Sequence, residues 1–129
     1  MHPPAIRRGS AAELDRGPVP YSLYVAVDRM VFVSGQASTD RDGRIVPDSF
    51  EGEFRRSLAN LQEVLAAAGC SLHDVVQTRN YVRDEDDLAL YNRLYAEHFP
   101  EPRPARTTIT GCLPKTLRYE IECVAVRPA

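Results

Sequence analysis

The chain has 129 residues, a length that fits one domain with a hydrophobic core of its own. Apolar residues make up 43% of the sequence and charged residues 26%, and the formal net charge is −2. This balance is typical of a soluble globular protein and argues against capture of nucleic acid by a basic surface. No apolar stretch reaches the roughly 18 residues of a membrane span, and the first residues lack a signal-peptide core. We therefore expect a cytoplasmic protein with no membrane partner.

We treat residues 1–129 as a single domain in which the segment 1–18 is loose, because Pro18 and Pro20 interrupt the chain before the first strand. Two apolar runs, 22–27 and 30–34, then predict a β-hairpin around Asp28-Arg29. Asp42-Gly43 is a strong turn signal after this hairpin.

Residues 48–68 have the clearest helical pattern in the sequence. Phe50, Phe54, Leu58 and Leu61 recur at steps of three and four residues, which forms one apolar stripe. Asp48 stands three residues before Glu51, the spacing of a capping box, and Gly69 follows the pattern where a glycine often ends a helix.

The second half of the chain alternates between strand and helix patterns. We expect strands at 75–82, 106–111 and 119–126 and a second helix at 86–99. This order predicts an α+β fold in which two helices cover one face of a mixed sheet. The uncovered face would carry Arg106, Thr107 or Thr108, and Glu120 or Glu122 among apolar residues. We therefore expect association of chains through the sheet and a site between subunits.

Arg106 is the first candidate for chemistry. It follows the stiff segment Pro102-Arg103-Pro104, which fixes where the strand begins. A guanidinium offers the planar pair of donors that binds a carboxylate with two hydrogen bonds. The alternative is a surface arginine in a solvated ion pair.

Glu120 is the second candidate, since it lies in a strand that should be largely buried. A buried carboxylate must be paired, hydrogen-bonded or protonated, and a raised pKa would make it a proton donor. It could instead be a structural partner of Arg118 or Arg106, and Glu122 on the same face competes for either role.

Ser34-Gly35-Gln36 closes the second strand and offers a glycine that a ligand can approach closely. From these residues alone, a bulge or turn at the strand end is the favoured alternative.

Metal and cofactor sites are not expected. The three histidines (His2, His73, His98) form no ligand motif, the three cysteines (Cys70, Cys112, Cys123) form no CxxC pair, and no glycine-rich phosphate loop occurs.

A series of short motifs in a characteristic order resembles the RidA family of reactive intermediate deaminases, also called the YjgF family. The resemblance extends from about Tyr21 to Val126. The motifs are Tyr21-Ser22, Val31-Phe32-Val33-Ser34-Gly35-Gln36, Leu58-Ala59-Asn60-Leu61, Ala68-Gly69-Cys70-Ser71-Leu72-His73-Asp74-Val75-Val76, Tyr91-Asn92, Pro104-Ala105-Arg106-Thr107-Thr108, Leu113-Pro114 and Tyr119-Glu120-Ile121-Glu122-Cys123-Val124-Ala125.

The resemblance implies a chorismate-mutase-like fold, a homotrimer, and hydrolysis of enamines or imines such as 2-aminoacrylate without a metal or organic cofactor. It implies that Arg106 holds the substrate carboxylate and that Glu120 positions water or moves protons. Tyr21, Ser34, Asn92 and the Gly35 backbone correspond to pocket residues of the family, as does position 108, which many members fill with cysteine and this chain fills with Thr108.

The stretch from Arg106 to Leu113 is also one residue shorter than is common in the family, which leaves the substrate open. A pathway-specific hydrolase acting on an aminomuconate-like or peracid-like carboxylate is one alternative. A module that only binds small carboxylates is another. RNA cleavage is disfavoured by the acidic balance and by the absence of an aromatic platform in the sequence.

Overall fold

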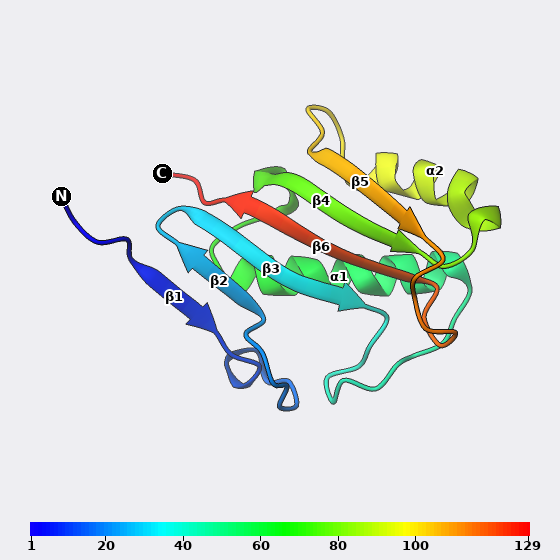
Figure 1. Cartoon of the computed structure of the whole chain (residues 1–129), viewed down its shortest axis with the longest axis horizontal. Helices are drawn as coiled ribbons and strands as arrows, with labels where there is room; N and C mark the ends of the chain where they lie inside the picture. Colours follow the sequence, from blue (N-terminus) through cyan, green and yellow to red (C-terminus); the bar gives the residue numbers. More distant parts are fainter.

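A computed structural model describes all 129 residues, and it contains one six-stranded sheet and two α-helices (Figure 1). The strands follow the order β1-β2-β3-β6-β4-β5, in which only the pair β4 and β5 is parallel. The elements are β1 Ile6–Gly9, β2 Tyr24–Val27, β3 Met30–Ala37, α1 Phe50–Ala67, β4 Val75–Val82, α2 Leu88–His98, β5 Ala105–Thr110 and β6 Tyr119–Val126. Both helices lie on the same side of the sheet, so the predicted α+β architecture is confirmed (Figure 1).

The N-terminal segment is more ordered than the sequence suggested. Residues 1–18 were expected to be loose, but β1 lies within them and pairs antiparallel with β2, with Ile6 opposite Val27. Ala11 and Leu14 follow it and are buried in the core. The sequence of β1 is Ile-Arg-Arg-Gly, and charged side chains of this kind are usual on an edge strand. The alternation of apolar residues that reveals an interior strand is therefore absent.

Helix α1 begins one position later than the capping-box spacing predicted. Its N-cap is Ser49, whose hydroxyl accepts a hydrogen bond of 3.1 Å from the Gly52 amide. Asp48 instead forms an ion pair of 3.6 Å with Arg56. At the other end, Gly69 has a φ of 82°, a left-handed conformation that glycine adopts without strain, as the sequence predicted. Helix α2 begins at Leu88 rather than residue 86 because a 3₁₀ turn, Glu85–Asp87, precedes it.

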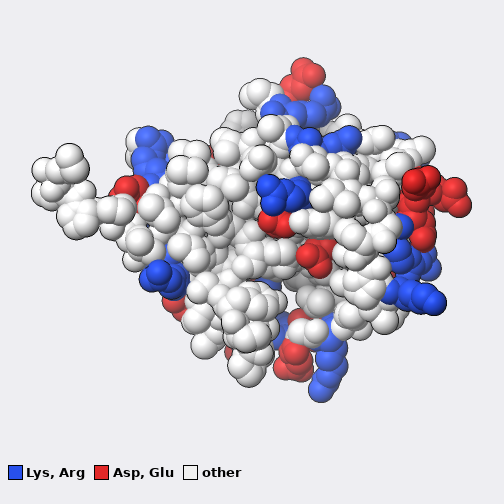
Figure 2. Space-filling model, viewed as in Figure 1, with Lys and Arg blue, Asp and Glu red and all other residues white.

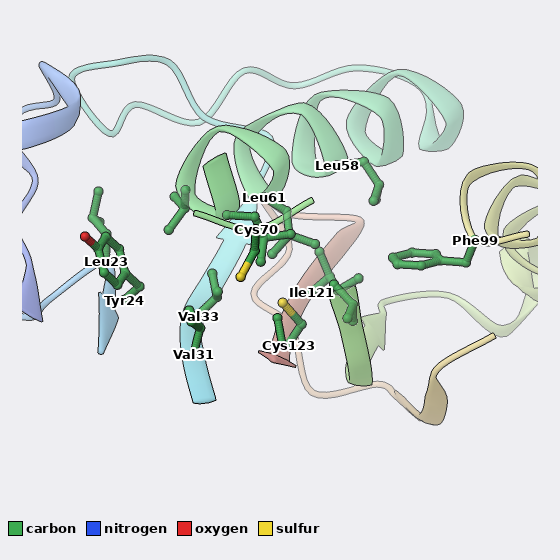
Figure 3. Packing of buried hydrophobic residues seen from close by; sticks show 14 of the residues in the cluster. Leu23, Tyr24, Val31, Val33, Leu58, Leu61, Cys70, Phe99, Ile121 and Cys123 are labelled. Carbon is green, nitrogen blue, oxygen red and sulfur yellow. The ribbon is translucent and has the colours of Figure 1, made fainter. Parts of the chain in front are cut away.

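The core lies between α1 and the sheet (Figure 3). The apolar stripe of α1, including Leu58 and Leu61, faces the inward side chains of β3 and β6, among them Val33 and Ile121 (Figure 3). Each fully buried leucine contributes roughly 1.5–3 kcal/mol to stability. This packing holds β3 and β6, which carry part of the candidate site, in a fixed register. None of the helices combines the length and the apolarity needed to cross a lipid bilayer.

The face of the sheet that no helix covers carries both apolar and charged side chains, as predicted. Along β6 the buried residues alternate with half-buried ones, which places Glu120 and Glu122 on this open face. The exposed Phe32 lies on β3 opposite Val124, beside a hollow of about 250 Å³. In space-filling view this face is mostly uncharged, with a few charged groups near its middle (Figure 2).

Arg106 does not lie on that open face, contrary to the prediction. In the parallel register of β4 and β5 it is opposite Thr78, which is fully buried beneath the helices, so its side chain is on the helix side of the sheet. The sequence pattern could not decide this, because β5 is an edge strand and none of its residues is fully buried.

Candidate functional site

A β-bulge in β3 shapes the first part of the site. Val33 pairs with Cys123 and Gln36 pairs with Ile121, so β3 has one extra residue at Ser34 and Gly35. The bulge that the sequence left open as an alternative is therefore present, and bulges often redirect side chains beside active sites. The Ser34 hydroxyl donates a hydrogen bond of 2.7 Å to the Ser22 carbonyl, which ties the bulge to the segment that follows Tyr21.

Glu120 lies directly against the glycine of this bulge. A Cβ atom at position 35 would be only 2.5 Å from the Glu120 Oε2 atom, so the carboxyl occupies space that only glycine leaves free. No hydrogen bond or ion pair within the chain holds this carboxyl. Burial, and secondarily the charge of Glu122, raise the pKa of Glu120. The group is therefore suited to give up a proton closer to neutral pH than an ordinary glutamate would.

Glu120, Gly35 and Tyr21 line a pocket of about 210 Å³ at the end of β3. Apolar side chains such as Leu23 and Leu117 form part of its wall. Gln36 also borders the pocket, but its amide oxygen accepts a bond of 2.8 Å from Arg16 and its amide nitrogen donates to the Ser34 carbonyl. The pocket therefore combines one unpaired carboxyl with walls that exclude part of the solvent.

Arg106 forms the second part of the site, at the opposite edge of the sheet. Its guanidinium carbon is 4.9 Å from the ring centroids of both Tyr91 and Tyr95 on α2, a geometry of cation–π contact. It belongs to none of the salt bridges of the chain. Arg106 is also exposed, so its donors are oriented by the rings yet remain available for an anion.

Hydrogen bonds fix the two rings beneath Arg106. The Tyr91 hydroxyl bonds Thr108 Oγ1 at 2.7 Å, and the Tyr95 hydroxyl bonds Thr78 Oγ1 at 2.6 Å. Burial raises the pKa of Tyr91 to about 12 and also raises the pKa of Tyr95. Both phenols are therefore neutral at physiological pH. Arg106 contacts the faces of these two rings, and the rings carry no negative charge that would neutralise it.

The residues predicted from sequence thus form two groups in one chain. Tyr21, Gly35 and Glu120 surround the pocket, while Arg106 and Thr108 lie on β5. Strand β4 separates β5 from β6, which corresponds to about 10 Å across the sheet. The two groups also lie on opposite faces, so one chain does not bring Arg106 and Glu120 together.

Asn92 and Ser34 are the remaining residues that the sequence predicted for the site. Asn92 is exposed on α2, next to Tyr91 in sequence, and Ser34 uses its hydroxyl within the chain. Sequence reasoning missed Tyr91 and Tyr95 as the support of Arg106. Their spacing of four residues was the available signal, because it places both rings on one side of a helix. No three His, Cys, Asp or Glu side chains lie together as metal ligands would.

Comparison with known proteins places this geometry in a family. The family model described as Endoribonuclease L-PSP matches residues 16–127. The mitochondrial protein mmf2 of Schizosaccharomyces pombe is 41% identical over 110 residues, which cover 82% of this chain and 86% of that protein. The 2-iminobutanoate/2-iminopropanoate deaminase of Mus musculus is 39% identical over 110 residues, covering 84% and 82% respectively.

Solved structures agree with the sequence comparison. The crystal structure of yeast Mmf1 superposes with a TM-score of 0.85 at 26% identity, covering 96% of this chain and 100% of that one. The matched residues 16–127 include every candidate site residue described above. The chain therefore belongs to the YjgF/RidA family.

Proposed function

We propose that the chain is a cofactor-independent deaminase that hydrolyses enamines and imines of small carboxylic acids to 2-oxo acids and ammonia. The observation that carries this proposal is Arg106, an exposed arginine that two tyrosine rings orient and no carboxylate of the chain neutralises. Such a group is suited to bind the carboxylate of a substrate. The similarity to mammalian 2-iminobutanoate/2-iminopropanoate deaminases gives independent support.

Each residue has a defined part in the proposed reaction. Arg106 holds the substrate carboxylate by two hydrogen bonds, and Thr108 adds a hydroxyl beside it. Glu120 delivers a proton to the β-carbon of the enamine, so that the C=C bond is lost and the carbon bearing nitrogen becomes part of a C=N iminium ion. Glu120 then accepts a proton from the water that adds to this iminium carbon. The resulting amino alcohol expels ammonia and leaves the 2-oxo acid. Tyr21 and the Gly35 backbone line the pocket, and Ser34 and Asn92 have supporting roles.

This reaction needs Arg106 and Glu120 around the same small molecule, and one chain holds them on opposite faces of the sheet. We therefore propose a homotrimer in which each site takes Arg106 from one chain and Glu120 from a neighbour. The partly apolar open face, with Phe32 43% exposed and Met30 45% exposed, supports association through the sheet. A seam between chains also excludes water, which strengthens the contact between arginine and carboxylate.

The other activities weighed from the sequence gain less support. A pathway-specific carboxylate substrate would use the same residues, so only substrate profiling separates it from the proposed hydrolysis of enamines and imines. Binding without turnover would not need a carboxyl of raised pKa at the pocket. The family description names an endoribonuclease, but a net charge of −2 does not favour binding to a phosphate backbone.

The cytoplasm remains the proposed compartment. All three cysteines are free, and buried free thiols such as those of Cys70 and Cys123 are usual in a reducing environment. Fractionation of cells that produce the protein with a small C-terminal tag tests this point. Recovery in an organelle, as the name of the fission-yeast relative implies for that protein, would contradict it.

A coupled assay tests the activity. A pyridoxal-phosphate dehydratase generates the enamine from serine or threonine, and semicarbazide traps the imine that remains when the purified chain is added. We expect the chain to suppress trapping and to accelerate formation of the 2-oxo acid, equally before and after treatment with a chelator. Trapping that the chain leaves unchanged for every amino acid tested would contradict the proposed function.

A further inference from the structure

Three polar side chains form a connected group on the open face of the sheet, beside Glu120. The Tyr81 hydroxyl on β4 donates a hydrogen bond of 2.6 Å to Glu122 Oε1 on β6. Arg79, two residues before Tyr81, lies 3.8 Å from Glu122 Oε2 and directly opposite Glu122 in the strand register. Neither the proposed reaction nor the core packing uses this group.

The register places the group next to the proposed proton donor. Tyr81 is the direct cross-strand neighbour of Glu120, yet its hydroxyl bonds Glu122 instead. Glu120 and Glu122 are two positions apart on β6, so their side chains leave the same face about 7 Å apart at the backbone. One carboxyl is therefore held by a donor and a cation, whereas the other is left free against Gly35.

We infer that Glu122 is a positioning residue for Glu120: Tyr81 and Arg79 hold its carboxylate on the open face, where its charge acts on the unpartnered carboxyl of Glu120. This inference rests on the proposed function, because it explains how Glu120 holds the proton that an enamine needs. A negative charge near a carboxyl disfavours the ionised form of that carboxyl. Glu122 is held in place by Tyr81 and Arg79, whereas Glu120 has no partner within the chain.

The other titratable or charged groups near Glu120 are few. Tyr21, Arg16, Asp40 and Arg41 line the same pocket. Arg16 and Arg41 form ion pairs with Glu63, and Asp40 accepts hydrogen bonds from backbone amides. Of all these groups, Glu122 is the one whose charge raises the pKa of Glu120, after burial itself.

The sign of the effect follows from the role of Glu120 as an acid. The protonated form is active, so the rate falls as the pH rises through the pKa of Glu120. Glu122→Gln removes the neighbouring charge, lowers that pKa, and should move the falling limb of kcat/KM to lower pH by about one unit. Glu122→Asp keeps the charge and should restore most of the wild-type profile.

Two further variants serve as matched comparisons. Arg79→Gln removes the cation that partly screens Glu122, so the falling limb should move slightly to higher pH. Glu97→Gln alters an exposed carboxylate on α2, whose nearest cation is Arg55 at 3.8 Å, and should leave the profile in place. Opposite shifts for Glu122→Gln and Arg79→Gln are a signature that loss of packing would not produce.

A direct titration separates this inference from the proposed function. The carboxyl carbon of Glu120 can be followed by ¹³C NMR in enriched protein and assigned by its loss in Glu120→Gln. We expect its midpoint to fall in Glu122→Gln even if no deaminase substrate is found. An unchanged midpoint would overturn the inference. If Glu122→Gln did not fold, the absence of an upward shift in Arg79→Gln would overturn it instead.

Discussion

The candidate site has two halves, one around Glu120 and one around Arg106, and the surroundings of these two charged groups differ. Glu120 is half-buried, contacts Gly35 closely, and has no partner within the chain. Arg106 is exposed, but two aromatic rings whose hydroxyls are themselves hydrogen-bonded fix its orientation. The difference follows from the chemistry of each group. A glutamate becomes an effective acid near neutral pH only when its charge is disfavoured, whereas an arginine is always charged and needs only to be oriented.

The largest expected effect comes from removing the acid. Glu120→Gln keeps the shape of the side chain and loses its proton, so we expect kcat to fall by about 10²- to 10⁴-fold while the fold is retained. Steady-state kinetics together with circular dichroism check this outcome, with Glu97→Gln as the surface control. Normal turnover in Glu120→Gln, combined with an inactive Glu122→Gln, would show that the two carboxyls have exchanged roles.

At Arg106 we expect activity to depend on the geometry of the hydrogen-bond donors more than on the positive charge. Arg106→Lys preserves the positive charge but loses the planar pair of donors and much of the contact with the tyrosine rings. We expect kcat/KM to fall by about 10- to 100-fold, the worth of one or two charge-assisted hydrogen bonds. Arg93→Lys, an exposed arginine of α2, is the matched control. Rates close to wild type for Arg106→Lys across carboxylate substrates would remove Arg106 from the site.

Gly35→Ala tests the close contact that distinguishes the glutamate half. Gly35 does not have a left-handed φ, so the backbone accepts alanine, but the new Cβ would be 2.5 Å from Glu120 Oε2. The flexible carboxyl must move, and we expect roughly a 10-fold loss of kcat with little loss of stability. Adding Glu120→Asp, which shortens the acid by one methylene, should recover part of the rate lost to Gly35→Ala. A Gly35→Ala enzyme with unchanged kcat would show that the contact is unimportant.

The smallest effect should come from the support of the arginine half. Tyr95→Phe keeps the ring under Arg106 and removes the bond of 2.6 Å to Thr78. Because Thr78 is fully buried, we expect the free energy of unfolding to fall by about 1 kcal/mol, while kcat/KM changes less than twofold. Urea denaturation and steady-state kinetics measure the two quantities separately. A large loss of activity would show that the Tyr95 hydroxyl itself takes part in the reaction.

The sequence was informative where periodicity was strong. The strands β4 and β6 have the predicted bounds, and the apolar stripe of α1 faces the sheet as expected. The edge strands were harder to predict, because their residues are not constrained by two neighbours. For this reason β1 was missed, and Arg106 on β5 was assigned to the wrong face.

The candidate site was predictable in residue types but not in arrangement. The motifs around Gly35, Arg106 and Glu120 pointed to these positions, and of the alternatives left open for Glu120 the structure shows no ion pair with Arg118 or Arg106. The bulge of β3, the rings of Tyr91 and Tyr95, and the bond between Tyr81 and Glu122 depend on contacts between residues far apart in sequence. Residue patterns along one strand or helix do not contain that information.

We propose that Arg106 of one chain and Glu120 of another complete each site. Light scattering should first give a mass of about 43 kDa, three chains of 14.4 kDa. The decisive measurement mixes equal amounts of the impaired variants Arg106→Lys and Glu120→Gln, unfolds them and refolds them together. Random assembly leaves both intact residues at about one seam in four, so we predict about one quarter of wild-type activity. Recovery no greater than the sum of the separately refolded variants, or a fully active monomer, would contradict the account.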